Sequence, residues 1–217
     1  MFIMYKKIKS IIYNRLAVHI LSFWIYLKWQ VYKTKHSSIN IILGAGETKY
    51  SGWFSTNINS IDVTKEKDFE RFFCHKRIDK VLAEHVLEHL TEEQILLMIK
   101  NLLKYSNNEL TVRIAVPDGF HAHSDYINMV KPGGYGCGSD DHKHLFNYQS
   151  LSNIFVPYRF AAELIEYWDE GKQFHSNYKN DDNGFVSRTF LHDERNFDGI
   201  PHYTSLIIDF ILRITDE

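Results

Sequence analysis

Histidine side chains are the groups in this sequence best suited to accept a proton near neutral pH, because their ordinary pKa is about 6.5. The chain contains 12 histidines. Six of them stand in three pairs, which are His85 and His89, His121 and His123, and His142 and His144. Asp118 adds a carboxylate near the second pair. We take His85, His142, His144 and Asp118 as candidate catalytic bases, and we expect His89 to bond backbone at a helix start.

These residues lie at or beyond the ends of segments whose apolar patterns predict regular structure. Strands are predicted over 38–44, 52–58, 78–84, 109–117, 161–168 and 203–212, and helices over 65–73, 91–105 and 147–158. Thr91 supplies a capping hydroxyl for the second of these helices. The apolar runs "VLA" and "IAV" suit strands that are buried on both faces. The pattern predicts a three-layer α/β domain with a mostly parallel sheet and an antiparallel last strand.

A glycine turn follows the first predicted strand in "IILGAGETKYSGW", residues 41–53. Ligands of open parallel sheets bind beyond the carboxyl ends of the strands, and glycine lets the backbone approach a ligand that a Cβ would block. Gly44 and Gly46 stand where such a turn is expected. A Gly-x-Gly pair also occurs in ordinary tight turns, so other parts of the chain must decide between the two interpretations.

The segment "DKVLAEHVLEHLTEEQ", residues 79–94, resembles the class I S-adenosylmethionine-dependent methyltransferases. The resemblance is to a small branch with "LGxG", a short "GW" turn and a strand that ends in "EHVLEHL". It continues through "LTVRIAVPDG" and "DDHKHLFNYQSLSNIF", so that it spans roughly residues 39–158. The resemblance implies a Rossmann-like methyltransferase fold, S-adenosylmethionine as cofactor and S-adenosylhomocysteine as product.

The same resemblance implies a set of cofactor-binding residues. They are Gly44, Ala45, Gly46 and Glu47 on the turn, Asn57 and Asp62 for the ribose or adenine, and Ala83, Glu84, His85, Leu87 and Glu88 for the amino-acid end. The family normally places an acid at the end of the second strand, where this chain has Asn57 and Asn59. The segment between Gly46 and Trp53 is also too short for the usual first helix, so we expect a loop there.

Two long polar segments, 118–146 and 169–202, are expected to bind the methyl acceptor, because loops of that length in a compact domain are usually functional. The candidate substrate-binding residues are His121, His123, Arg188, Arg195 and Tyr203. These side chains favour a small polar acceptor, either a saccharide or a phosphorylated molecule. Methyltransferases of this kind often modify surface glycans, so the expected reaction is O-methylation in polysaccharide biosynthesis.

Two alternative functions stay open at this point. A metal-dependent hydrolase could use a ligand set of His121, His123, Asp140, Asp141, His142 and His144. The methyltransferase interpretation itself expects no metal. The second alternative is a catalytically inactive partner subunit that binds the cofactor, because Asn57 replaces the expected acid.

Composition and the N-terminal segment set the remaining expectations. With 217 residues and a net charge of −2, the chain predicts one domain with no affinity for nucleic acid. Cys74 and Cys137 form no disulfide or zinc pattern, which favours a cytoplasmic protein. Residues 1–36 are expected to form an apolar, basic helix before a methyltransferase domain at 37–217. The apolar core of this helix is shorter than the ~20 residues of a membrane span. We therefore expect the helix to dock on its own domain, to form a homodimer contact or to make a peripheral membrane contact.

Overall fold

The computed structural model describes residues 20–213 and contains one mixed seven-stranded sheet. The strand order across the sheet is β2-β1-β3-β4-β7-β5-β6. The strands are β1 (Asn40–Leu43), β2 (Trp53–Ser55), β3 (Ile78–Glu84), β4 (Ser106–Pro117), β5 (Phe160–Trp168), β6 (Phe174–Ser176) and β7 (Ser205–Leu212). The six strands expected from the apolar patterns are all present, and β6 is an additional short strand inside a segment expected to be a loop.

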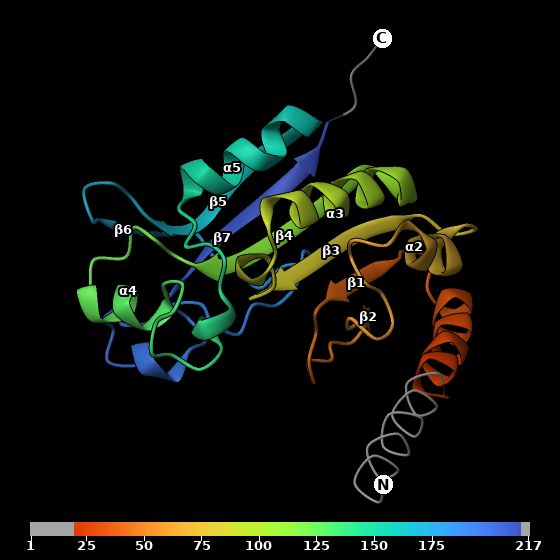
Figure 1. Ribbon diagram of the computed structural model, residues 1–217, viewed down its shortest axis with the longest axis horizontal. Coiled ribbons are helices and arrows are strands. Elements are labelled where there is room, and N and C mark those ends of the chain that lie inside the picture. The colour runs from red at the N-terminus through yellow and green to blue at the C-terminus, as the bar shows by residue number, and fades with distance from the viewer. Residues whose placement is uncertain (1–19, 214–217) are drawn as a thin grey trace, which may run out of the picture.

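The strand directions confirm the expected Rossmann-like methyltransferase fold. β1 pairs in parallel with β2 and with β3, and β3 pairs in parallel with β4. β7 lies between β4 and β5 and is antiparallel to both. Figure 1 shows β7 between β4 and β5, so the last strand of the chain lies inside the sheet and not at its edge. The connection from β1 to β2 is a loop, as the short spacing predicted.

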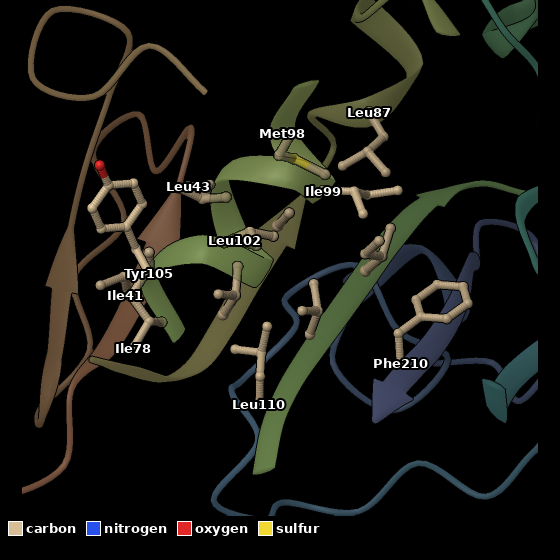
Figure 2. Packing of buried hydrophobic residues seen from close by; sticks show 14 of the residues in the cluster. Ile41, Leu43, Ile78, Leu87, Met98, Ile99, Leu102, Tyr105, Leu110 and Phe210 are labelled. Atoms are coloured by element: carbon tan, nitrogen blue, oxygen red, sulfur yellow. The ribbon is translucent and has the colours of Figure 1, made fainter. Parts of the chain in front are cut away.

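The helices pack on one face of the sheet. They are α2 (Glu66–Phe73), α3 (Glu92–Tyr105), α5 (Tyr148–Phe155) and the N-terminal helix, described over residues 20–35. Figure 1 shows α3 and α5 lying across this face, and Figure 2 shows Met98, Ile99 and Leu102 of α3 against the strands. Thr91 and Gln94 form the capping box that starts α3, so the predicted helix start is confirmed. The main hydrophobic core lies between these helices and the sheet.

The opposite face of the sheet is covered by the irregular segment 177–204. Ile42, Leu82 and Ile207 point to this side and pack with Tyr178 and Val186 of that segment. The third layer of the fold is therefore built from loop rather than from helix. A short helix, α4 (Ser124–Val130), and four 3₁₀ turns lie in the remaining connections; the turns are η1 (Leu87–His89), η2 (Ser139–Asp141), η3 (Val156–Tyr158) and η4 (Glu194–Asn196).

The N-terminal helix presents one side to the core and another to solvent. Trp29 and Tyr32 are buried and pack on Phe54, and Trp29 also packs on Phe73 of α2. Within residues 20–213 no helix is long and apolar enough to cross a membrane. The remainder of the expected helix, before residue 20, lies outside the described residues. The described part is thus docked on its own domain through its aromatic side.

Arg113 of β4 connects the irregular layer to the sheet. Its side chain is 1% exposed and donates two hydrogen bonds of 2.7 Å to the carboxylate of Asp209 on β7. It also donates to both carboxylate oxygens of Asp181, at 2.8 and 2.9 Å, and to the carbonyl oxygen of Gly184, at 2.8 Å. A guanidinium that is paired on two sides in this way fixes the position of segment 181–184 on the sheet.

Replacing Arg113 with alanine is expected to destabilise the fold by about 3–5 kcal/mol, because Asp209 stays buried without a counter-ion. Urea unfolding at pH 7 measures this free energy. The matched control is Lys65→Ala, which removes an exposed cation paired with Asp62 and should change stability little. Equal stabilities of the two variants would contradict the structural role of Arg113.

Candidate active site

A polar cavity of about 390 Å³ lies at the carboxyl ends of β1 and β3. Its volume falls in the range of about 300–1,000 Å³ that is usual for small-molecule sites. The lining residues are Ile42, Leu43, Gly44, Ala45, Gly46, Glu47, Thr48, Leu82, Glu84, His85, Glu88, His89, Cys137, His142, Ser187 and Arg188. Three carboxylates, three imidazoles and one guanidinium thus face a single small space.

The glycine turn after β1 forms one wall of this cavity. Gly44 and Gly46 have φ of +60° and +56°, a conformation that glycine adopts without steric cost. A Cβ on Gly44 would come within 2.6 Å of a methyl group of Val86, whereas one on Gly46 would meet no atom within 4 Å. The side-chain oxygen of Asn57 accepts a hydrogen bond from Gly46 N at 2.7 Å, and its amide donates to Gly46 O. The turn is therefore held open by backbone conformation and by Asn57.

Glu84, at the end of β3, closes the cavity from the side of the irregular layer. Its Oε1 accepts hydrogen bonds from Ser187 N at 3.1 Å, Ser187 Oγ at 2.6 Å and Arg188 N at 3.0 Å. These contacts bring Arg188 to the cavity wall. Within residues 20–213 no carboxylate lies within ion-pairing distance of the Arg188 guanidinium. The guanidinium is therefore available to an anionic ligand group.

His85 adopts an uncommon backbone conformation at the tip of β3. Its φ is +52°, which is rare for a residue with a side chain and is often found at functional sites. Its backbone N–H donates to Ala115 O at 2.8 Å. Its ring lies between two partners: Nδ1 is 3.1 Å from Glu88 Oε1, and Nε2 is 3.2 Å from Ser205 Oγ. The imidazole is thereby fixed in the wall of the cavity.

Glu88, in η1, is fully buried behind His85. Burial works to raise the pKa of Glu88, but His85 beside it and His89 near it outweigh that effect and hold the pKa below its usual value. The backbone carbonyl oxygen of Glu88 accepts hydrogen bonds from Lys143 N at 2.6 Å and from His144 N at 3.3 Å. These bonds hold the "DDHKH" segment against η1. The two motifs identified in the sequence, around Glu88 and around His142, therefore meet in one place.

Seven of the expected cofactor-binding residues line the cavity, namely Gly44, Ala45, Gly46, Glu47, Glu84, His85 and Glu88. Four others do not. Asn57 is engaged with Gly46, and Asp62 accepts from Thr64 and pairs with Lys65 at 3.0 Å. Ala83 and Leu87 point into the core on the helical side of the sheet, where Figure 2 shows Leu87 near Ile99.

Two of the four candidate bases, His85 and His142, line the cavity, and the other two do not. Asp118 is fully buried and accepts hydrogen bonds from Phe120 N and Trp168 N, both at 2.8 Å. Burial raises its pKa to about 6. His144 stacks on Phe146 and faces a separate hollow beside α5. Both residues therefore lie away from the cavity. The partner of Asp118, Trp168, is 50 positions away, so no local sequence pattern could show this burial.

Of the expected substrate-binding residues, only Arg188 is at the cavity. His123, Arg195 and Tyr203 line a different hollow, next to α4. There the Arg195 guanidinium pairs with both carboxylate oxygens of Asp193 and stacks on the ring of Tyr203 at 3.3 Å. His121 is 1% exposed, and its ring stacks on Tyr126 at 3.9 Å. These four residues stabilise the connections instead of facing a ligand at the glycine turn.

The six-residue ligand set of the hydrolase alternative is not assembled. His121 is buried against Tyr126, His123 faces the hollow beside α4, and only His142 of the six reaches the cavity. His89, which we expected to bond only backbone, also lines the cavity, as does Cys137. The Glu-His pair that recurs four positions apart, as Glu84-His85 and Glu88-His89, was the available signal for His89.

Comparison with known proteins gave structural matches only, since no protein family profile and no curated protein matches the chain. A SAM-dependent methyltransferase from Archaeoglobus fulgidus aligns over 88% of this chain and 93% of its own, with 15% identity and a TM-score of 0.47. The plantazolicin methyltransferase BpumL in complex with SAH aligns over 96% and 90%, with 16% identity and a TM-score of 0.43.

Magnesium protoporphyrin IX methyltransferase (ChlM) from Synechocystis PCC 6803 with bound SAH aligns over 92% of this chain and 83% of its own. The identity is 11% and the TM-score is 0.41.

Burial lowers the pKa of His121 to about 3, so the folded protein keeps this residue neutral where the unfolded chain protonates it, below about pH 6.5. The stability that His121 contributes is present above pH 6.5 and is lost as the pH falls. Relative to His121→Phe, which keeps a ring against Tyr126, the wild type should lose roughly 2 kcal/mol between pH 7 and pH 5. Urea unfolding at both pH values measures the difference; a pH-independent difference would show that His121 titrates normally.

Proposed function

We propose that the protein is an S-adenosylmethionine-dependent methyltransferase that methylates an oxygen atom of a small polar acceptor. The observation that carries the proposal is the meeting of two distant segments in one cavity. Gly44, Ala45, Gly46 and Glu47 on the turn, and Glu84, His85 and Glu88 after β3, were expected from the sequence to hold the cofactor, and all seven line the same space. They lie at the carboxyl ends of adjacent parallel strands, where ligands of this sheet class bind.

The residues of the cavity suit a sulfonium nucleoside. The positive-φ turn at Gly44 and Gly46 lets the backbone approach the ligand closely. The carboxylates of Glu47 and Glu84 favour a ligand that carries a positive charge. When bound, S-adenosylmethionine supplies an electrophilic methyl group. The protein then has to hold the acceptor in line with that group and to remove its proton.

The remaining cavity residues suit the acceptor. Arg188 can pair with a phosphate or carboxylate group through two parallel hydrogen bonds. His85 and His142 are the expected bases that line the cavity, and Glu88 beside His85 stabilises the protonated imidazole. A saccharide or phosphorylated acceptor, as in surface-glycan biosynthesis in the cytoplasm, fits this polar lining. Asn57 supports the turn through its side chain, which gives an asparagine at this position a structural role.

The N-terminal helix supports a second part of the proposal, a peripheral contact with membrane lipid. Its solvent-facing side carries Ile20, Trp24, Leu27 and Val31, which are 38–58% exposed and recur at helical spacing. Lys28 and Lys35 are exposed on the same helix. An apolar stripe that includes tryptophan beside lysines matches the interface of an anionic bilayer. We place this face against lipid rather than against a second copy of the chain.

Calorimetry with S-adenosylhomocysteine tests the cofactor site. Gly46→Asn should lower the affinity by about tenfold or more, because its side chain enters the ligand space while asparagine tolerates a left-handed backbone. The control is Gly52→Asn. Gly52 also has a positive φ, of +79°, and a Cβ there would meet no atom within 4 Å, but Gly52 lies outside the cavity. No binding to the wild type, or equal loss in both variants, would refute the proposed cofactor site.

Sedimentation with vesicles of phosphatidylcholine and about 30% phosphatidylserine tests the lipid contact. The full chain should bind, and Trp24→Asn should weaken binding by about tenfold. Leu97→Asn, at an exposed apolar residue on α3, is the control and should bind as the wild type does. Light scattering of the free protein is measured in parallel. A stable dimer that Trp24→Asn dissociates, with no vesicle binding, would assign the stripe to a homodimer instead.

A further inference from the structure

We propose that Glu88, His89 and His142 form a binding site for a divalent transition-metal ion in the wall of the cavity. Each residue offers one ligand atom, and the three atoms lie within 4.8 Å of one another. Among residues 20–213, this is the one group of three carboxylate, imidazole or thiol side chains that lie close enough together to share an ion. Metal–nitrogen and metal–oxygen bonds of about 2.0–2.2 Å are reached from these separations by small side-chain movements.

Glu88 supplies an independent reason for an ion at this place. Its side chain is fully buried, and within residues 20–213 neither of its oxygens accepts a hydrogen bond of regular geometry. The Nδ1 atom of His85 lies 3.1 Å from Oε1, but Oε2 has no polar neighbour of that kind. A buried carboxylate oxygen that lacks a donor, as Oε2 does, is costly, and buried charges are normally paired or bound to metals. A cation beside Glu88 would supply the missing partner.

The two histidines are oriented as metal ligands usually are. The ring Nδ1 of His142 lies 2.6 Å from the carbonyl oxygen of Val130, which makes Nδ1 the protonated nitrogen and leaves the lone pair on Nε2. The Nδ1 of His89 lies 3.5 Å from a carboxylate oxygen of Asp141, whose negative charge favours a proton on Nδ1 and the lone pair on Nε2. The two rings are 4.7 Å apart at 80°. Contacts of this kind to the second ring nitrogen set the tautomer that binds a metal.

Backbone bonds hold the three residues together without an ion. Glu88 and His89 lie in η1, directly after β3, and His142 follows η2 more than fifty positions later. The bonds from Lys143 N and His144 N to the carbonyl oxygen of Glu88 join these two segments. The ligand set is therefore preorganised by the main chain.

The ligand types determine which ions fit. Two imidazoles and one carboxylate suit Zn²⁺, Mn²⁺, Fe²⁺ or Co²⁺, whereas Mg²⁺ and Ca²⁺ prefer oxygen ligands alone. Three protein ligands leave coordination positions open for a small molecule, as in catalytic metal sites. The role of the ion, though not the site itself, rests on the proposed methyl transfer. An ion bound at this site would hold the acceptor oxygen and ease loss of its proton to solvent.

Titration of the chelator-treated full chain with Zn²⁺ by calorimetry tests the site. One ion should bind per chain, and Mg²⁺ should bind much more weakly. His89→Ala and His142→Ala should each lower Zn²⁺ affinity by about tenfold or more. Glu88→Gln should do the same. The control is His75→Ala, which removes an exposed histidine outside the cavity and should leave the affinity unchanged.

The proposed site would be overturned if all three variants still bound Zn²⁺ as the wild type does. It would also be overturned if the wild-type chain bound no Zn²⁺, or bound Mg²⁺ equally well. If Glu88→Gln does not fold, the two half-buried histidines decide the outcome. Binding of S-adenosylhomocysteine is measured on the same preparations. Zn²⁺ binding without S-adenosylhomocysteine binding would leave the metal site and reject the methyltransferase, and the reverse result would reject the metal site alone.

Discussion

The ion cluster that joins buried Arg113 and Asp209 to the more exposed Asp181 is the interaction on which the shape of the cavity depends. The helices cover only one face of the sheet, so the other face needs a cover that has no regular hydrogen-bonding pattern of its own. Arg113 bonds segment 181–184 to the middle of the sheet. A few residues later the same segment donates three hydrogen bonds to Glu84 at the end of β3. The cavity wall at Ser187 and Arg188 is thus anchored at two points of the sheet.

A second constraint comes from the backbone at the two strand ends. Gly44 and Gly46 after β1, and His85 after β3, all have positive φ. Residues in this conformation turn the chain away from the strand direction, which leaves space between the two tips. For His85 the conformation costs of the order of 1 kcal/mol or more. Its hydrogen bonds to Ala115 and Ser205 and its ion-pair contact with Glu88 offset that cost. The strain therefore fixes an imidazole beside the ligand space.

The polar residues of the long connections are divided between two places. Glu88, His89 and His142 meet at the cavity because the carbonyl oxygen of Glu88 bonds the segment that follows η2. His121 instead stacks on Tyr126 of α4. Arg195 stacks on Tyr203 and pairs with Asp193. Buried rings and bidentate ion pairs use the same side chains that a ligand site would need. For this reason a histidine-rich loop is not by itself evidence of a binding site.

Much of the fold could be predicted from the sequence, because periodic apolar patterns, the capping residues at Thr91 and the glycines after β1 act over a few residues. These local signals placed six of the strands, the three helices and the glycine turn near their observed positions. The burial of Asp118 away from the cavity could not be predicted, because the Trp168 N–H that it binds is 50 positions away. His89 was likewise separated from His142, and Glu84 from Ser187, by more than fifty positions. The sequence by itself determined six of the seven strands and the glycine turn, because their signals are local. Only the tertiary structure decided which polar side chains face the cavity, since that depends on partners that packing brings together from distant segments.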